Sequence, residues 1–216
     1  WSSQHCDPFL WRVTSDEVLV QWCLEHGARV RIADRRTRSI LERAANCGNF
    51  AAFKLLHSAG APLGRRTLHL AIEAASVEAA SLGRTGSEDP EKDTEKQRQS
   101  RDNYADRMAL VRYLIDEVHL DVNADDWKPG DMGFSGHGGS GTPICYAIDH
   151  CNPEWVKNAR ALIWLLLDRG ADPAPALKDA NTYGMTMFVE YVYEWRAERG
   201  RSRAEEAWSR RACCVQ

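Results

Sequence analysis

The segments VLVQWCLEHGA (Val18–Ala28) and AAFKLLHSAGA (Ala51–Ala61) decide the fold of this chain. Each is an apolar stretch with helical spacing that ends in a Gly-Ala pair, and the two pairs stand 33 residues apart. A third close copy, LIWLLLDRGADP, ends on Gly170-Ala171-Asp172-Pro173. Self-similarity at a fixed period of this length is typical of stacked helical repeats. Glycine at such a position closes a helix in a left-handed conformation that a side chain would disfavour.

The second of these units, SILERAANCGNFAAFKLLHSAGA (Ser39–Ala61), resembles the ankyrin repeat. The positions that agree without a gap are Leu41, Ala44, Ala45, Gly48, Leu55, Leu56, Gly60 and Ala61. Further unit openings are Thr67-Leu68-His69-Leu70-Ala71, Gly141-Thr142-Pro143-Ile144 and a degenerate Gly184-Met185-Thr186. Leu120–Ala124 matches the segment that follows a second helix, with His119 at the glycine position. The resemblance covers most of the chain, from Asp7 to Tyr193.

This resemblance implies an all-α fold, an ankyrin-like helical solenoid of four to five units with short finger loops. We expect an ankyrin-repeat domain over residues 7–200, followed by a capping helix and C-terminal tail over residues 201–216. Ser202 and Glu205 have the spacing of a capping box, which predicts a helix start there. Leu55 and Leu56 should fill the seam between units, where Leu55→Ala would cost roughly 2–5 kcal/mol. His69 should make a structural hydrogen bond.

Two insertions interrupt the period. Residues 83–103 contain five basic and six acidic side chains and no aliphatic or aromatic residue. We therefore expect one disordered, flexible insertion, either a docking loop or a merely solvated one. Residues 125–141 form a long finger loop, in which Trp127 and Phe134 stand among glycines. Exposed aromatic side chains on a loop indicate recognition, and the alternative is that they fold back over the core.

Composition limits the compartment and the partners. The net charge of −3 gives no reason to expect binding to nucleic acid or to an anionic membrane. Seven cysteines without framework spacing favour a reducing, intracellular location, and we expect the cytoplasm. The apolar run Leu162–Leu167 is far too short to span a bilayer. Because the chain opens on Trp1, we expect the native start to lie before it.

No group of residues predicts catalysis, a metal site or a cofactor. The glycine cluster Gly133–Gly141 lacks the lysine and the Ser/Thr of a phosphate-binding loop. Cys145, His150 and Cys151 would need a distant fourth ligand to hold zinc. We expect that this chain is not an enzyme.

The function implied by the resemblance is binding of a protein partner on the concave surface of finger tips and first helices, by a monomeric chain. Arginine suits such a surface because its planar fork binds carboxylates and stacks on aromatic rings. The alternative, which stays open, is that these arginines only keep the protein soluble. The candidate basic residues are Arg29, Arg31, Arg35, Arg36, Arg65 and Arg66, and the acidic and aromatic candidates are Asp125, Asp126, Trp127 and Phe134.

The last four residues, Cys213-Cys214-Val215-Gln216, have the form of a C-a-a-X prenylation box. The terminal glutamine favours a farnesyl group on Cys213, and Arg210-Arg211 lie just upstream. A prenylated, membrane-tethered ankyrin adaptor is therefore the alternative function. We expect membrane contact only if Cys213 is lipidated.

Overall fold

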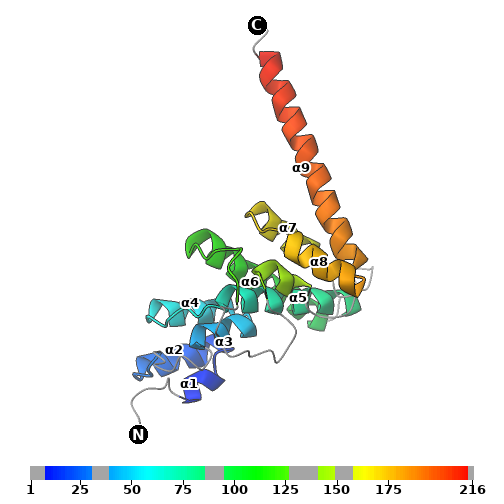
Figure 1. Ribbon diagram of the computed structural model, residues 1–216. Helices are drawn as coiled ribbons and strands as arrows, with labels where there is room; N and C mark the ends of the chain where they lie inside the picture. Colours follow the sequence, from blue (N-terminus) through cyan, green and yellow to red (C-terminus); the bar gives the residue numbers. More distant parts are fainter. Residues whose placement is uncertain (1–7, 31–38, 86–94, 127–140, 149–157, 214–216) are drawn as a thin grey trace.

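The computed structural model describes residues 8–30, 39–85, 95–126, 141–148 and 158–213. All regular elements in these ranges are helices and none of them is a strand, so the all-α prediction is confirmed for this part of the chain (Figure 1). In chain order the elements are α1 (Pro8–Arg12), α2 (Glu17–Glu25), α3 (Ile40–Cys47), α4 (Phe50–Ser58), α5 (Thr67–Thr85), α6 (Glu95–Arg112), the π-helix η2 (Tyr113–Glu117), the 3-10 helix η3 (Pro143–Ala147), α7 (Arg160–Asp168), α8 (Ala174–Tyr183) and α9 (Thr186–Cys213).

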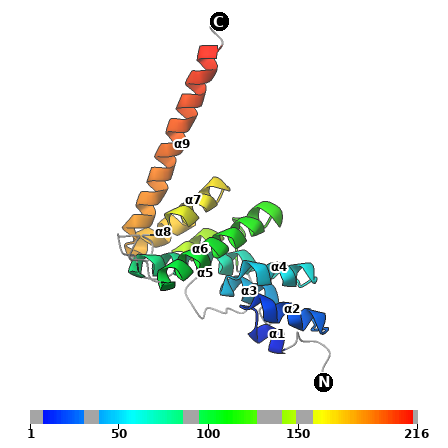
Figure 2. The same ribbon diagram turned by 180° about the vertical axis from the view of Figure 1, so that it is seen from behind.

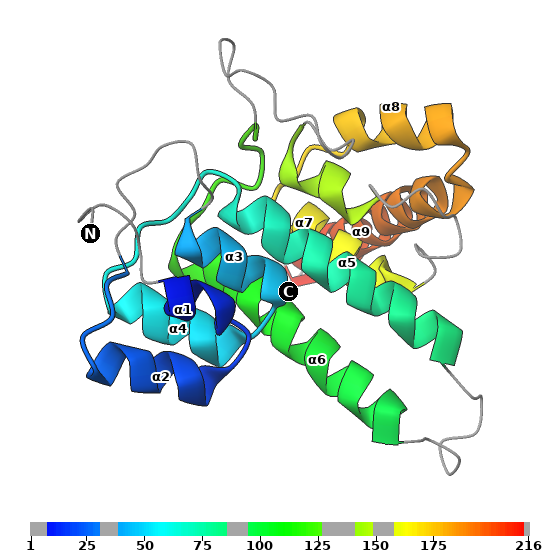
Figure 3. The ribbon, with the colours of Figure 1, turned by 90° about the horizontal axis from the view of Figure 1, so that it is seen from below.

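Contacts between the helices follow their order in the chain (Figures 1 and 3). Helices that follow one another pack as pairs: α1 with α2, α3 with α4, α5 with α6, η3 with α7, and α8 with α9. The first helices of neighbouring pairs also touch, α3 against α5, α5 against η3 and η3 against α8. Among the second helices, α2 packs against α4, α4 against α6, and α7 against α9. The buried apolar side chains form one cluster from Leu10 in α1 to Val192 in α9.

The three Gly-Ala pairs make the same turn. Gly27, Gly60 and Gly170 have φ values of 80°, 81° and 90°, in the left-handed region. In each pair the alanine N–H donates to the carbonyl five residues earlier, over 2.9, 3.1 and 3.0 Å respectively. The sequence prediction of left-handed glycines at these helix ends is confirmed.

His119 takes the glycine position of the third unit, as the alignment predicted. Its φ of 60° is the only positive value of a non-glycine among the described residues. The next amide, Leu120 N–H, donates to Leu114 O six residues earlier, at 2.9 Å. This hydrogen bond spans one residue more than those of the Gly-Ala turns. The reason is that η2 is a π-helix, whose hydrogen bonds span five residues where those of an α-helix span four.

The prediction that residues 83–103 form one flexible insertion is wrong at both ends of this segment. Residues 83–85 belong to α5 and residues 95–103 to α6, while residues 86–94 lie outside the described residues. Polar side chains link the two extended helices: Ser100 Oγ donates to Glu78 Oε1 at 2.6 Å, and Arg107 Nη2 lies 3.4 Å from Glu78 Oε2. Glu, Lys, Gln and Arg also form helix readily without apolar neighbours. Composition alone therefore overstated the disorder.

The C-terminal units also differ from the prediction. Gly184 does not open a unit, because it ends α8 with a φ of 71° and precedes the second helix of that pair. No separate capping helix begins at Ser202, since α9 runs unbroken from Thr186 to Cys213. Its C-terminal half extends away from the other helices (Figures 1 and 2). No helix within the described ranges combines the length and the apolar character needed to cross a membrane.

The two leucines of α4 differ in burial. Leu56 is completely buried, whereas Leu55 is only partly buried against the core. We therefore move the large cavity effect from Leu55 to Leu56: Leu56→Ala should lower the free energy of unfolding by about 2–5 kcal/mol. Leu55→Ala is the matched control and should lower it distinctly less. Urea unfolding followed by circular dichroism measures both, and equal losses would contradict this assignment.

Candidate functional site

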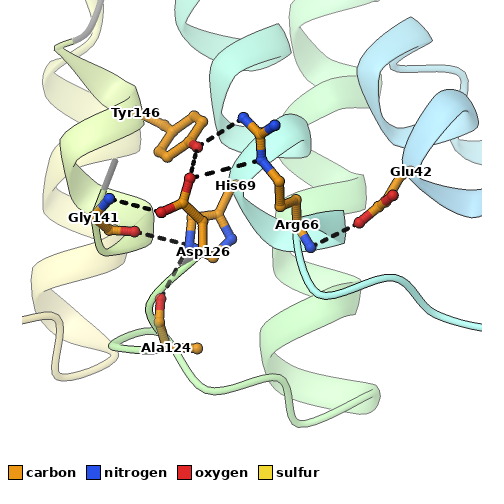
Figure 4. A network of polar contacts seen from close by, with 7 residues as sticks. All are labelled: Glu42, Arg66, His69, Ala124, Asp126, Gly141 and Tyr146. Carbon is orange, nitrogen blue, oxygen red and sulfur yellow. Dashed lines mark hydrogen bonds and ion pairs between the residues drawn. The ribbon is translucent and has the colours of Figure 1, made fainter. Parts of the chain in front are cut away.

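A network of polar contacts joins the second, third and fourth helix pairs at the base of the predicted finger loop (Figure 4). Its side chains come from α3, from the start of α5, from the segment after η2 and from η3. Sequence separations of up to 80 residues lie between its partners. The residues drawn together in Figure 4 are Glu42, Arg66, His69, Ala124, Asp126, Gly141 and Tyr146.

His69 in α5 contacts both flanks of residues 127–140. Its Nε2 lies 3.0 Å from Ala124 O and 3.2 Å from Gly141 O. Carbonyl oxygens only accept hydrogen bonds, so Nε2 carries the proton and donates to them. His69 is 1% exposed, and this burial holds its pKa below the usual value despite the nearby carboxylate of Asp126. The structural hydrogen bond expected of His69 is present.

Asp126 joins the same two flanks through hydrogen bonds to Gly141. Its N–H donates to Gly141 O at 3.2 Å, and Gly141 N–H donates to Asp126 Oδ1 at 2.8 Å. Gly141 has a φ of 148°, and a Cβ there would approach Cys145 Sγ to 3.3 Å. Together with His69, these bonds bring the two flanks of residues 127–140 to one fixed base.

Tyr146 in η3 connects this base to Arg66. Its hydroxyl donates to Asp126 Oδ2 and accepts from Arg66 Nη2 at 2.8 Å. The ring of Tyr146 stands edge-on to the His69 ring, with 5.0 Å between the centroids. Burial and the Asp126 hydrogen bond raise the pKa of Tyr146 well above its usual value. Tyr146 is therefore a neutral donor at physiological pH.

Arg66 is held at both its ends. Its Nε lies 3.7 Å from Asp126 Oδ2, and its backbone N–H donates to Glu42 Oε1 at 2.9 Å. The other carboxylate oxygen of Glu42 accepts the Ser39 N–H at 2.9 Å in a capping box. A Cβ at Gly64 would collide with the Glu42 carboxylate, so a side chain there would displace Glu42 from these hydrogen bonds.

These contacts involve two residues of the predicted partner-binding set. Arg66 and Asp126 were both predicted to contact a partner, and in the structure they pair with each other. The Asp126 side chain is only 8% exposed and that of Arg66 25%, because the network encloses them. Both side chains are engaged in this network, and partner contact by either of them stays a prediction.

The other candidates divide into two groups. Arg29, Arg65 and Asp125 are exposed in the structure. Residues that lie outside the described ranges are Arg31, Arg35, Arg36, Trp127 and Phe134. Cys213 is the last residue of α9.

Sequence analysis missed Tyr146 and Glu42. No motif in the sequence singles out Tyr146, which stands next to Cys145, one of the three residues considered as zinc ligands. Cys145 is buried, and burial raises the pKa of its thiol, which makes it a poor metal ligand or nucleophile. For Glu42 the signal was present, because Ser39 and Glu42 have capping-box spacing.

The described residues contain no group of three or more His, Cys, Asp or Glu that could hold a metal ion. His150 and Cys151, the other candidates beside Cys145, lie outside the described ranges. The absence of an enzymatic or metal site from the whole chain stays a prediction.

The protonation state of His69 can be tested through stability. The folded state holds the His69 pKa below that of the unfolded chain, so on acidification the unfolded state binds the proton first. Stability should fall as the pH drops from about 7.5 to about 5. His69→Gln keeps an amide donor and removes the titration, so its urea midpoint should depend less on pH. The same pH dependence in both proteins would contradict a buried, neutral His69.

The chain has no match among protein-family models, among curated proteins or among solved structures.

Proposed function

We propose that the chain is an ankyrin-like helical solenoid that binds a protein partner through its finger loops and first helices. The observation that carries this proposal is the base of the finger loop. His69 on α5 and Tyr146 on η3 bind Ala124, Asp126 and Gly141, so two neighbouring helix pairs hold the flanks of residues 127–140. Such a base suits recognition, because binding loops act from rigid supports and lose less entropy when they bind.

The repeat itself supports the solenoid. Three Gly-Ala turns share one hydrogen-bond pattern, and His119 takes the equivalent position in the third unit, which has no Gly-Ala pair. Contacts between helices run from each pair to the next in chain order. Each unit of a solenoid touches only its neighbours, which leaves one elongated surface of loops and first helices for a partner.

The remaining candidate residues define the chemistry of the partner. Arg29 and Arg65 are exposed, and Arg31, Arg35 and Arg36 follow Arg29 closely in sequence. An arginine-rich surface fits carboxylates and aromatic rings on the partner. Asp125, Trp127 and Phe134 would contact it from the long finger.

The proposal is tested by comparing captured proteins. The full chain and the double variant Arg31→Glu/Arg35→Glu are used as baits in extracts of the native cells, and captured proteins are identified by mass spectrometry. A specific partner should bind the variant at least about tenfold more weakly, since each lost charge-assisted contact contributes about 1.5–3 kcal/mol. Arg196→Glu/Arg201→Glu on α9 makes the same change of net charge and should bind as the wild type does. A partner that both variants bind equally well would remove the basic finger from the site.

A second candidate function, membrane tethering through Cys213, has one observation in its favour. α9 ends at Cys213 and extends away from the other helices, so a lipid there would have room to reach a membrane (Figure 2). A single prenyl chain gives reversible attachment only, and nearby arginines add affinity for anionic lipids.

Mass spectrometry of the C-terminal peptide of the native protein tests the lipid directly. A peptide that ends at a farnesylated Cys213 supports the tether. An unmodified Cys213, or a native chain that continues beyond Gln216, refutes it.

A further inference from the structure

An apolar patch is exposed on α2, on the side turned away from the core. Val18, Leu19 and Trp22 are 74%, 39% and 51% exposed, and we call these three residues the α2 patch. Val20 and Cys23 of the same helix are buried. The Trp22 ring is stacked on His26 with 4.1 Å between the centroids. An exposed, positioned tryptophan between two aliphatic side chains is typical of binding hot spots.

The 33-residue repeat relates the α2 patch to a helix whose neighbours are known. Val18, Leu19 and Trp22 align with the α4 residues Ala51, Ala52 and Leu55, because the Gly-Ala pairs align. In α4 none of these three is exposed, since Ala52 is buried and the other two are partly buried. The same register position is therefore covered in α4 and uncovered in α2.

The contacts of α4 indicate which helix covers this register position. One flank of α4 faces the following pair, where Phe50 and Phe53 pack on Tyr113 and His57 Nδ1 lies 2.9 Å from the Tyr113 hydroxyl. With 3.6 residues per turn, the positions of Ala51 and Leu55 lie on the opposite flank. α4 also packs against α2. We infer that this flank receives the preceding helix.

The repeat thus predicts a helix-binding face at the α2 patch, and no helix among the described residues covers it. A helix docked there would continue the row of second helices, with α2 packed against it as α4 packs against α2. The geometry selects a helical occupant with an apolar stripe, because ridges and grooves of two helices must interlock along this face.

The acidic side chains around the α2 patch indicate which kind of helix can dock there. Asp16, Glu17 and Glu25 surround the α2 patch and are exposed, and no Lys or Arg occurs between Val13 and Ala28. A second copy presenting the same face would bring carboxylates against carboxylates, which disfavours association. A helix with Lys or Arg beside its apolar stripe would meet them with opposite charge.

We propose that the α2 patch docks a basic amphipathic helix of a partner protein. This is a second binding surface, formed by the outer face of α2, and it does not depend on the proposed finger-loop function. Trp22 is the anchor that the partner's apolar stripe covers, and Glu17 and Glu25 pair with the flanking basic residues.

The test uses the full chain and synthetic helical probes. A fluorescein-labelled peptide of Leu, Ala and Lys, with Leu at helical spacing and Lys on both sides of the stripe, is titrated by fluorescence polarisation. A matched peptide carries Glu in place of every Lys. The Lys peptide should bind at least about tenfold more tightly than the Glu peptide, and equal binding would overturn the proposal.

Variants locate the binding. Val18→Gln/Trp22→Gln should weaken the Lys peptide at least about tenfold, which corresponds to about 1.4 kcal/mol. Tyr183→Gln, which alters a 68% exposed side chain on α8, should leave binding unchanged. Glu17→Lys/Glu25→Lys should reverse the preference toward the Glu peptide. The folded state of each variant is checked by its circular dichroism.

Two results would overturn the proposal. The first is peptide binding that survives Val18→Gln/Trp22→Gln. The second is a dimer of the wild-type chain, seen by light scattering, that this double variant converts to monomer. That result would assign the α2 patch to a second copy.

Discussion

Each helix pair in this chain depends on its neighbours to bury its apolar side chains. α3 and α4 are 8 and 9 residues long, and isolated helices of that length are marginal in water. Both become stable because α3 packs against α5 while α4 lies between α2 and α6. The buried apolar side chains of these helices form one cluster from α1 to α9. Within the described residues, the apolar side chains on the outer face of α2 are exposed.

The polar network of Figure 4 also depends on contacts between neighbouring helix pairs. Buried charges are tolerated only when they are paired and hydrogen-bonded, and here the partners are far apart in the sequence. Glu42 bonds to Arg66, Arg66 to Tyr146 and Tyr146 to Asp126, so the first helices are linked across three pairs. The apolar core supplies most of the stability, while this network fixes the positions of Asp126 and Gly141, which flank residues 127–140.

Sequence reasoning succeeded where one residue type meets one local requirement. The Gly-Ala pairs predicted the left-handed turns, and the alignment predicted His119 in a place where a side chain is rarely tolerated. It failed where long-range pairing decides. Nothing local to Arg66 or Asp126 shows that they will meet across 60 residues. Residues 95–103 were misread because composition does not reveal that α5 offers Glu78 as a partner.

The most direct test of nearest-neighbour stabilisation is native-state hydrogen exchange, followed by mass spectrometry, of the wild type and of a chain weakened within α4. The structure predicts that amide protection falls most in α4 and in the helices packed on it, α2, α3 and α6, and least in α8 and α9. A loss of equal size along the whole chain would contradict the account, and so would a loss confined to α4 alone.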